Sequence, residues 1–250
     1  MKHSGVFVMV LALLPALLQA EPSPKVTPSP TVAVSLSSSI VKWNQCSNDN
    51  GLITFWANVE GSKVIAFRGE GIVNAPIEKV ASIIIDYTRG TEWINSLVES
   101  KALRNVSDTE FVEYDHVSIP FPFSTVISDR DFVSDVNILY DKKDQSLTVS
   151  YKPTEDSDTP PYRKFTRGII DCEFRVTRMS MPDQTYVQAK VFTDPKGSIP
   201  KWLVNFFQQS WPQDTFEGLR NQVKKTDIGI LPVVSKLLGI SSTEKEAASN

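Results

Sequence analysis

His116 is the side chain of this sequence best suited to proton transfer, because an imidazole titrates close to neutral pH. It lies in a stretch, residues 110–118, whose alternation predicts a strand with Val112, Tyr114 and His116 on one face. There His116 could hydrogen-bond a bound ligand or act as a general base together with Asp115 or Tyr114. A third interpretation is a hydrogen-bonded histidine in the core or at its rim.

No motif of a known catalytic or cofactor site is present. The sequence has no Gly-x-Ser-x-Gly elbow, phosphate loop or dinucleotide fingerprint, and Gly69-Glu70-Gly71 is too short to count as one. His116 and the two cysteines do not make up a zinc constellation. We therefore expect neither a metal nor a cofactor.

The composition predicts one domain with a large apolar core. Of the 250 residues, 41% are hydrophobic, and 13 Phe and 5 Trp are among them. The net charge of −3 lacks the basic excess that a nucleic-acid partner requires. No apolar run reaches the roughly 20 residues of a membrane-spanning helix. We expect a monomer.

The amino terminus has the pattern of a targeting signal. Lys2 and His3 precede the apolar residues 6–18, and Leu18-Gln19-Ala20 suits a cleavage site, so residues 1–20 are predicted to be a signal peptide. An uncleaved anchor is the alternative. Residues 21–39 are predicted to be a Pro/Ser-rich linker, residues 40–226 a folded domain and residues 227–250 an extension. The protein is expected to be exported, either periplasmic or secreted.

Export would permit a disulfide bond between Cys46 and Cys172, because an oxidising compartment maintains such bonds. Closing so long a loop would stabilise the fold by about 4–5 kcal/mol in the chain-entropy model. Two buried thiols are the alternative, since Cys172 shares a predicted strand face with Ile170, Phe174 and Val176.

Hydrophobic periodicity predicts an α+β order of elements. A short helix is possible at residues 34–43, a hairpin is expected from residues 52–58 and 63–73, and a helix follows a cap at Asn74. A helical turn ends near Trp93. Six strands are then expected, at residues 96–104, 110–118, 131–140, 145–151, 167–179 and 185–193.

The stretch 194–225 is predicted to be one long amphipathic helix. Ser198 suits its cap, Pro200 its first turn, and Pro212 is expected to kink it. Its apolar stripe consists of Ile199, Trp202, Leu203, Phe206, Phe207, Phe216, Leu219 and Val223. One helix cannot bury so much aromatic surface alone, so a large, curved, mainly β partner is expected.

A set of short motifs, in order along residues 41–225, resembles the START (StAR-related lipid transfer) domain. The motifs are Gly69-Glu70-Gly71, Ala75-Pro76-Ile77-Glu78-Lys79-Val80, Trp93, Leu97-Val98-Glu99-Ser100, Arg130-Asp131-Phe132-Val133, Asp194-Pro195-Lys196-Gly197 and Ile199-Pro200-Lys201-Trp202-Leu203-Val204-Asn205. The resemblance implies the helix-grip fold, in which a bent antiparallel sheet wraps around a long C-terminal helix and encloses a hydrophobic cavity.

The resemblance also implies a function, which is non-enzymatic binding and transfer of one lipid, sterol-like or isoprenoid molecule, with transient contact to a membrane surface. Burial of the ligand's apolar surface in an enclosed cavity would supply the affinity. A closed cavity needs a gate, and the loops at residues 119–123 and 153–164 are the candidates.

The expected ligand-binding residues fall into three groups. They are Tyr114, His116, Val136 and Tyr151 on the sheet, Phe121 and Phe123 in the apolar loop, and Trp202, Phe206 and Phe207 on the long helix. Several sterol-carrying animal members have a buried arginine at the place of Val136, so this chain lacks that charged group. Arg130 and Asp131 are expected to be structural, fixing the start of a strand and an adjacent loop.

Two alternative functions remain at this point. The wider helix-grip superfamily includes aromatases and cyclase-like proteins, and such an enzyme would use His116 with Asp115 or Tyr114. A lipid-responsive interaction module would act through residues 228–240. That segment is otherwise expected to dock a short helix on the domain or to touch a membrane.

Overall fold

The computed structural model describes residues 42–157, 159, 161 and 164–240. The predicted signal peptide, the linker and residues 241–250 of the extension lie outside the described residues. So does most of the helix that was considered possible at residues 34–43.

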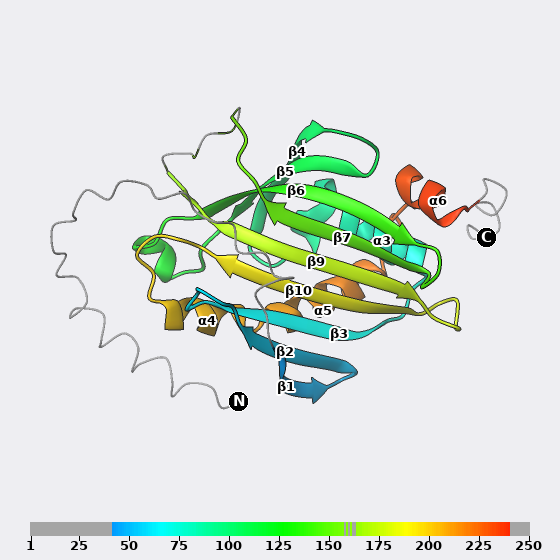
Figure 1. Cartoon of the computed structure of the whole chain (residues 1–250), viewed down its shortest axis with the longest axis horizontal. Coiled ribbons are helices and arrows are strands. Elements are labelled where there is room, and N and C mark those ends of the chain that lie inside the picture. The colour runs from blue at the N-terminus through cyan, green and yellow to red at the C-terminus, as the bar shows by residue number, and fades with distance from the viewer. Residues whose placement is uncertain (1–41, 158, 160, 162–163, 241–250) are drawn as a thin grey trace. The chain divides into compact units, whose positions relative to one another are not determined.

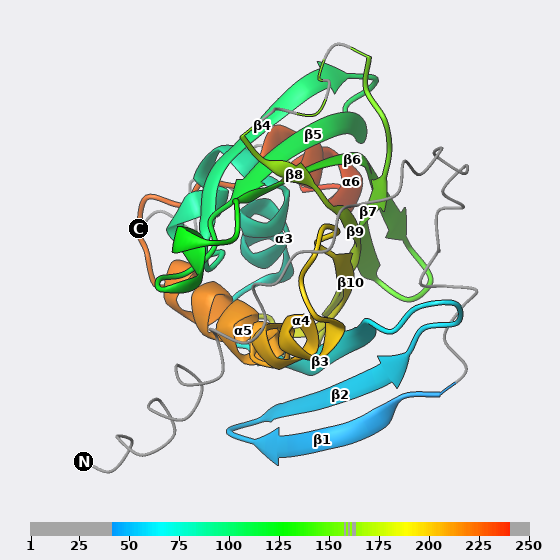
Figure 2. The ribbon, with the colours of Figure 1, turned by 90° about the vertical axis from the view of Figure 1, so that its left-hand side faces the viewer.

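The described residues form a sheet of ten strands (Figure 1). Neighbours in the order β1-β2-β3-β10-β9-β7-β6-β5-β4 pair antiparallel, and β8 pairs in parallel with β6. The bounds are β1 Asn44–Asp49, β2 Leu52–Asn58, β3 Ile65–Val73, β4 Leu97–Asn105, β5 Glu110–Val117, β6 Arg130–Asp141, β7 Ser146–Pro153, β8 Thr166–Arg167, β9 Ile169–Arg178 and β10 Thr185–Asp194. Figure 2 shows the sheet bent around α3 and α5.

The helical segments of the described residues lie along the concave face and ends of this sheet. They are α3 Ile77–Ile85, η2 Tyr87–Glu92, η3 Phe123–Thr125, α4 Lys201–Gln208, α5 Trp211–Gln222 and α6 Pro232–Leu238. The expected α+β order and helix-grip fold are confirmed. The predicted hairpin is β2 with β3, and the six further strands are found as β4, β5, β6, β7, β9 and β10.

Two strands, β1 and β8, were not expected. β1 has the sequence Asn-Gln-Cys-Ser-Asn-Asp, which lacks the apolar alternation of a half-buried strand, and it lies at the sheet's edge, paired with β2 alone. β8 is two residues long and pairs with the start of β6. Neither strand has a hydrophobic period, so no pattern in the sequence predicts it.

The long C-terminal helix that was expected is present in two pieces, α4 and α5, and residues 194–200 are not helical. The interruption lies at residues 209–210, just before Pro212. Pro212 occupies the first turn of α5, where a missing N–H removes no helical hydrogen bond. Proline therefore begins a new helix rather than kinking a continuous one.

The helix that fills the concave face is α5. Its Phe216 and Leu219 are fully buried in the main core, together with side chains of α3, β3 and β9. A Cβ at Gly69 of β3 would lie 2.9 Å from the Cβ of Pro212, so a glycine is required where α5 crosses the strand. This close approach explains one glycine of the Gly69-Glu70-Gly71 motif.

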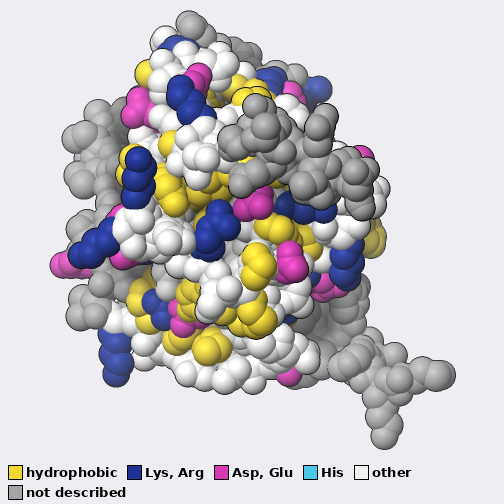
Figure 3. Space-filling model, turned by 90° about the vertical axis from the view of Figure 1, so that its right-hand side faces the viewer, with side chains coloured by type: hydrophobic (Ala, Val, Ile, Leu, Met, Phe, Trp, Pro, Cys, Tyr) yellow, Lys and Arg dark blue, Asp and Glu magenta, His cyan; other side chains and the backbone are white. Residues whose placement is uncertain are grey.

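The extension beyond α5 docks on the domain. Val234 of α6 is fully buried, and the backbone N–H of Leu231 donates to Ser82 Oγ of α3 at 3.0 Å. Figure 3 shows the face on the α6 side of the molecule, where acidic, basic and apolar side chains are interspersed. Of the two outcomes expected for this segment, the described residues adopt the docked helix.

The possible disulfide is not formed, because both cysteines are free. Cys46 lies exposed on β1 and Cys172 is buried on β9, four positions away in the strand order. Strands about 4.8 Å apart put these positions roughly 19 Å apart. A disulfide bond requires Cα atoms within about 7 Å of each other.

Among the described helices, none is both long enough and apolar enough to cross a membrane.

Candidate functional site

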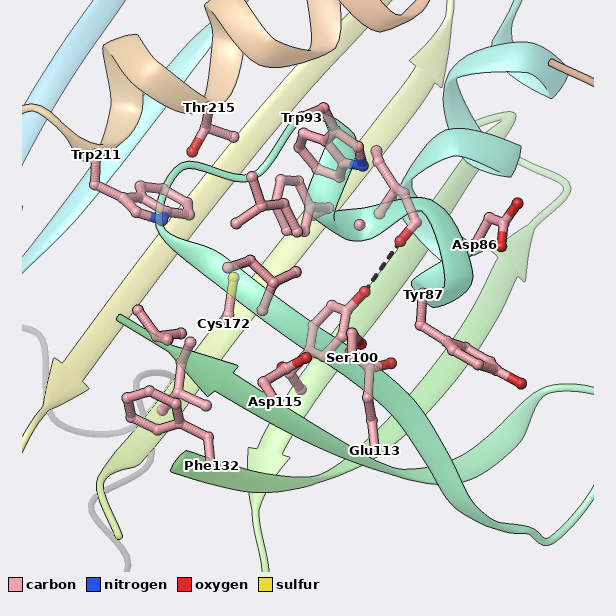
Figure 4. A pocket seen from close by; sticks show the side chains of 18 residues that line it. Asp86, Tyr87, Trp93, Ser100, Glu113, Asp115, Phe132, Cys172, Trp211 and Thr215 are labelled. Carbon is pink, nitrogen blue, oxygen red and sulfur yellow. Dashed lines mark hydrogen bonds between the residues drawn. The ribbon is translucent and has the colours of Figure 1, made fainter. Parts of the chain in front are cut away.

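A cavity of about 100 Å3 lies between the concave face of the sheet and the segments α3, η2 and α5 (Figure 4). Aromatic rings from several elements form much of its wall, namely Trp93, Phe132, Tyr151, Phe174 and Trp211. Phe174 is the centre of this group, with ring centroids 6.3 Å from Trp93, 6.4 Å from Tyr151 and 6.2 Å from Trp211. Tilted and edge-on contacts of this kind stabilise aromatic clusters.

Local packing positions the two tryptophans. Gly218 of α5 lies directly against the backbone carbonyl of Trp93, where a Cβ would not fit, so α5 holds the turn after η2 close to the cavity. Trp211 begins α5, one residue before Pro212. The indole N–H of Trp93 is buried and has no acceptor among the described residues.

The hydroxyl of Tyr151 connects the sheet to a helix. It donates to the carbonyl oxygen of Ile84, near the end of α3, at 3.2 Å. Burial raises the pKa of Tyr151 well above its usual range. The Tyr151 hydroxyl therefore stays protonated and serves as a hydrogen-bond donor at the cavity wall.

Two carboxyl groups of β5, from Glu113 and Asp115, also line the cavity. In Figure 4 they lie beside Ser100 of β4, on the side of the cavity away from Trp211 and Thr215. Ser100 Oγ donates to Glu113 Oε1 at 3.2 Å. Glu113 Oε2 and Asp115 Oδ1 are buried and receive no hydrogen bond from an N–H or hydroxyl of the described residues.

The environment of these two acids favours their protonated forms. Burial raises the pKa of Asp115 to about 6. Burial, together with the charge of Asp115, raises the pKa of Glu113 well above its usual range. A hydrogen bond between the two carboxyls requires that one of them carries a proton. With a pKa of about 6, Asp115 is mostly ionised at neutral pH, while burial and the charge of Asp115 make Glu113 keep its proton more readily.

Tyr114 and His116, which were expected to face the cavity, lie on the opposite face of β5. His116 Nε2 is 2.9 Å from Asp129 Oδ2, and its ring stacks on Phe165 at 4.1 Å. Tyr114 packs with Val112 and Val133 in a separate cluster. The side chains of His116 and Asp115 leave opposite faces of the strand, so the two do not form a pair. Tyr114 shares the face of His116, and neither of them lines the cavity. His116 instead has the position of a hydrogen-bonded histidine at the rim.

The physical reason is that both faces of β5 are covered. Asp156 bonds to Arg104, and Arg167 bonds to Asp131, so these two residues from the segment between β7 and β9 cover the convex face of the sheet here. Apolar alternation then marks Val112 and Tyr114 as buried without saying which face they occupy. Of the expected sheet residues, Tyr151 lines the cavity, and Val136 is buried in the main core without reaching the wall.

The aromatic residues expected from the loop and the long helix lie together, outside the cavity. We call Phe121, Phe123, Trp202, Phe206 and Phe207 the apolar end. The side chains of Phe121, Trp202 and Phe206 are 82%, 64% and 58% exposed. Phe123 and Phe207 meet edge to face at 4.9 Å, which joins the loop to α4. Figure 1 shows α4 beside the short helix η3 at one end of the sheet.

The orientation of α4 corrects the expected place of its aromatic stripe. α4 packs on the sheet through Val204, which is 4% exposed, and through Asn205, whose Oδ1 accepts from the backbone N–H of Ile65 at 3.1 Å. This leaves Trp202, Phe206 and Phe207 facing away from the cavity. Their part in ligand binding stays a prediction.

Arg130 and Asp131, expected to be structural, begin β6. Arg130 is 3% exposed and donates from Nε to the carbonyl of Pro195 at 2.7 Å, which ties the start of β6 to the loop before α4. Asp131 Oδ2 accepts from Arg167 Nη2 at 2.9 Å. Neither residue lines the cavity.

Sequence reasoning missed the acids of the cavity, as well as Ser100, Trp93, Trp211 and Phe174 on its wall. A signal was present: Glu113 and Asp115 alternate with Phe111 and Val117, so two acids interrupt an otherwise apolar strand face. Within the described part of the chain, no group of three or more His, Cys, Asp or Glu side chains is placed to hold a metal ion.

Relatives share about a quarter of their residues with this chain. An uncharacterized protein of Pseudomonas aeruginosa is 25% identical over 187 residues, which cover 73% of this chain and 87% of that protein. The StAR-related lipid transfer protein 5 of Mus musculus is 27% identical over 190 residues, covering 73% of this chain and 86% of that protein.

A solved fragment of the STAR-related lipid transfer protein from Xanthomonas axonopodis is similar with a TM-score of 0.65 at 26% identity, covering 73% of this chain and 99% of that chain. Human StAR-related lipid transfer protein 5 has the same fold, with a TM-score of 0.67 at 23% identity over 73% of this chain and 86% of that chain. The sequence profile of the START domain matches residues 35–225. With its bent sheet, its C-terminal helix and the cavity between them, the chain belongs to the START domain family.

Proposed function

We propose that this protein binds one lipid-like molecule in the cavity and carries it between membranes without transforming it. The aromatic wall formed by Trp93, Phe174 and Trp211 is the observation that carries the proposal. Apolar ligand surface buried against such a wall contributes about 25 cal/mol per Å2. Relatives named as lipid transfer proteins support a lipid as the cargo.

The cavity has to enlarge to admit a lipid. Its volume of about 100 Å3 corresponds to a few water molecules at roughly 30 Å3 each, whereas ligand sites usually measure about 300–1,000 Å3. The break at residues 209–210 lies beside Trp211, which lines the cavity and begins α5. We expect α4 and Trp211 to move when the ligand enters.

The apolar end supplies the membrane contact in this proposal. Exposed aromatic side chains gathered on a loop and a neighbouring helix are typical of surfaces that meet lipid or protein. The basic residues beside it, Lys196 and Lys201, are paired with Asp194. The contact therefore rests on insertion of aromatic rings rather than on attraction to anionic lipid.

Delivery outside the cytoplasm is part of the proposal and is supported by the signal pattern in residues 1–20. Mass determination of the chain recovered from a secreting host tests it. A mature chain that begins at Glu21 is expected, and a chain that retains Met1 would contradict export with cleavage.

An enzyme built on His116 is not favoured, because the imidazole lies on the opposite face of the sheet from the cavity and is paired with Asp129. No second function is proposed.

Native mass spectrometry of the protein from a lipid-containing host tests the carrier proposal. We expect one bound molecule per chain, in the mass range of a lipid. Cys172→Phe puts a ring into the cavity and should abolish the adduct, whereas Cys46→Phe, on the exposed edge strand, is the matched control and should retain it. Overpacking costs about 1–3 kcal/mol, so the melting temperature of both variants is recorded. A folded Cys172→Phe variant that keeps its lipid would refute the site.

Cosedimentation with phosphatidylcholine vesicles tests the apolar end. The variant with Phe121→Ser and Phe206→Ser should lose most of its vesicle binding. Leu139→Ser removes an apolar side chain of β6 that is 63% exposed and should have no effect. Equal vesicle binding by all three proteins would show that the apolar end is not the membrane contact.

A further inference from the structure

The polar part of the cavity wall is acidic. Glu113 is 6% exposed, and Glu113 Oε2 and Asp115 Oδ1 are buried without a donor from an N–H or hydroxyl of the described residues. The side chains that line the cavity include no Lys, Arg or His among the described residues. Two acids therefore face a space that supplies no positive charge.

The fold holds these acids in the wall rather than in solvent. In the antiparallel ladder, Asp115 lies opposite Ser100 of β4 and Phe132 of β6, and Glu113 lies opposite Ser134. Ser134 is 1% exposed, and its hydroxyl has no partner among the described residues. Strands on both sides of β5 thus fix the carboxyls toward the cavity, because a change of register by one residue would move them to the other face.

Resting on the proposed lipid-carrier function, we propose that the bound lipid carries a protonated amine in its polar head and that Glu113 and Asp115 hold this ammonium group. A buried negative charge without a cation beside it is unfavourable, and an ammonium group supplies both the opposite charge and several N–H donors. The indole N–H of Trp93, which also lacks an acceptor, suits an oxygen atom elsewhere in the same ligand.

Other head groups fit this wall less well. A carboxylate or phosphate would bring a second negative charge beside Asp115, and like charges close together in a buried site repel strongly. A hydroxyl offers one hydrogen bond and no charge, so it leaves the negative charge of the pair unbalanced. The aromatic rings of Trp93, Tyr151 and Trp211 are compatible with an alkylammonium group, because ring faces attract cations.

The affinity for an amine is expected to depend on pH, because all the ionisable side chains that line the cavity affect its charge. Apart from the acid pair, the ionisable groups on the described wall are Asp86 and Tyr87 near the end of α3, Tyr151 of β7 and Cys172 of β9, all of them acids. The pKa of Asp115 is raised to about 6 by burial. As the pH falls through that value, Asp115 becomes uncharged and the advantage of an ammonium ligand declines.

Three amphiphiles with one tail and different heads test the ligand class: dodecylamine, dodecanol and dodecanoic acid. Binding to the full chain is followed by isothermal titration calorimetry and by the fluorescence of the wall tryptophans. At pH 7 we expect dodecylamine to bind about tenfold or more tightly than either of the others, as a charge-assisted hydrogen bond allows. The preference should decline toward pH 5.

The variant with Glu113→Gln and Asp115→Asn should bind dodecylamine and dodecanol within about twofold of each other, because it has lost the charge but kept the shape. Glu173→Gln, which alters a carboxylate paired with Lys190 outside the cavity, is the matched control and should keep the preference. If the double variant does not fold, Asp115→Asn alone and the pH series of the unaltered protein give the same comparison.

The outcomes separate this inference from the carrier function. Dodecanol or dodecanoic acid bound as tightly as dodecylamine at pH 7 would overturn the amine and leave the carrier intact. Binding of none of the three amphiphiles, together with no adduct in native mass spectrometry, would overturn both. A preference for amine that survives in the folded double variant would place the ammonium group away from Glu113 and Asp115.

Discussion

Buried carboxylates on the two faces of the sheet have different partners. On the convex face, Asp131 Oδ2 lies 2.9 Å from Arg167 Nη2, and Asp171 Oδ1 lies 2.7 Å from Lys152 Nζ. On the concave face, Glu113 and Asp115 meet the hydroxyl of Ser100 and each other. All four residues come from strands of one sheet.

This contrast indicates different roles for the acids that are paired with cations and for the acid pair at the cavity. A buried acid with a cation at hydrogen-bond distance supports the fold, because losing either partner leaves an uncompensated charge. An acid pair without a cation weakens the fold and is tolerated where a ligand supplies the missing partner. We therefore expect substitutions to have opposite effects on the two faces.

The largest effect is expected on the convex face. Arg167→Ala leaves Asp131, whose side chain is 1% exposed, without its cation, and should lower the free energy of unfolding by about 3–5 kcal/mol. Urea denaturation measures it. Lys190→Ala, whose partner Glu173 is 25% exposed, is the control and should lose less than about 1 kcal/mol. Equal losses of unfolding free energy in the two variants would show that burial does not make the ion pair of Arg167 with Asp131 more important than that of Lys190 with Glu173.

On the concave face, substitution of a buried acid should raise the free energy of unfolding, and the size of this gain should depend on pH. Because the pKa of folded Asp115 is raised to about 6, above its value in the unfolded chain, the folded state binds a proton more tightly. The contribution of protonated Asp115 to the free energy of unfolding is therefore fully present below about pH 4. It is lost as the pH rises through about 6, by up to roughly 3 kcal/mol. Asp115→Asn should therefore be more stable than the unaltered protein at pH 7.5 and similar to it at pH 4.

Urea titrations of ligand-free protein at several pH values measure this effect. Asp135→Asn, at an exposed position of β6, is the control. A gain in Asp115→Asn that does not change with pH would show that packing rather than ionisation is responsible.

A smaller effect is expected at His116. His116→Ala removes one hydrogen bond to Asp129 on the convex side, which contributes about 1 kcal/mol to stability. Since the imidazole does not reach the cavity, the affinity for dodecylamine should stay within about twofold of the unaltered protein. Calorimetry checks it, and a tenfold loss of affinity would show that the two faces of β5 are not independent.

The smallest effect is expected for an ion pair in solvent. Lys236 of α6 and Asp108 are 2.8 Å apart, but their side chains are 74% and 69% exposed. Lys236→Ala should leave the free energy of unfolding almost unchanged, because water and salt screen an ion pair this exposed. Val234→Ala, which removes a fully buried contact of the same helix, should cost about 1–3 kcal/mol. The reverse order would mean that charge rather than apolar contact holds α6 in place.

Much of the fold could be predicted from the sequence, because local rules determine it. Alternation located the hairpin and six further strands within a few residues, and the apolar period of α3 was clear. The polar strand β1 and the two-residue β8 carry no such period and were missed. The break between α4 and α5 was anticipated at Pro212 but misjudged as a kink, because the sequence does not tell whether proline ends one helix or begins another.

The sequence by itself determined the order of the elements, the family and the presence of more aromatic surface than one helix can bury. Tertiary structure decided which side of each element meets the cavity. A period of two separates Glu113 and Asp115 from Tyr114 and His116, but it does not tell which set faces α5. That choice depends on Asp156 and Arg167, which cover the convex face, and on Val204 and Asn205, which turn the aromatic stripe of α4 away from the cavity. These contacts join residues far apart in the chain, and no local pattern contains them.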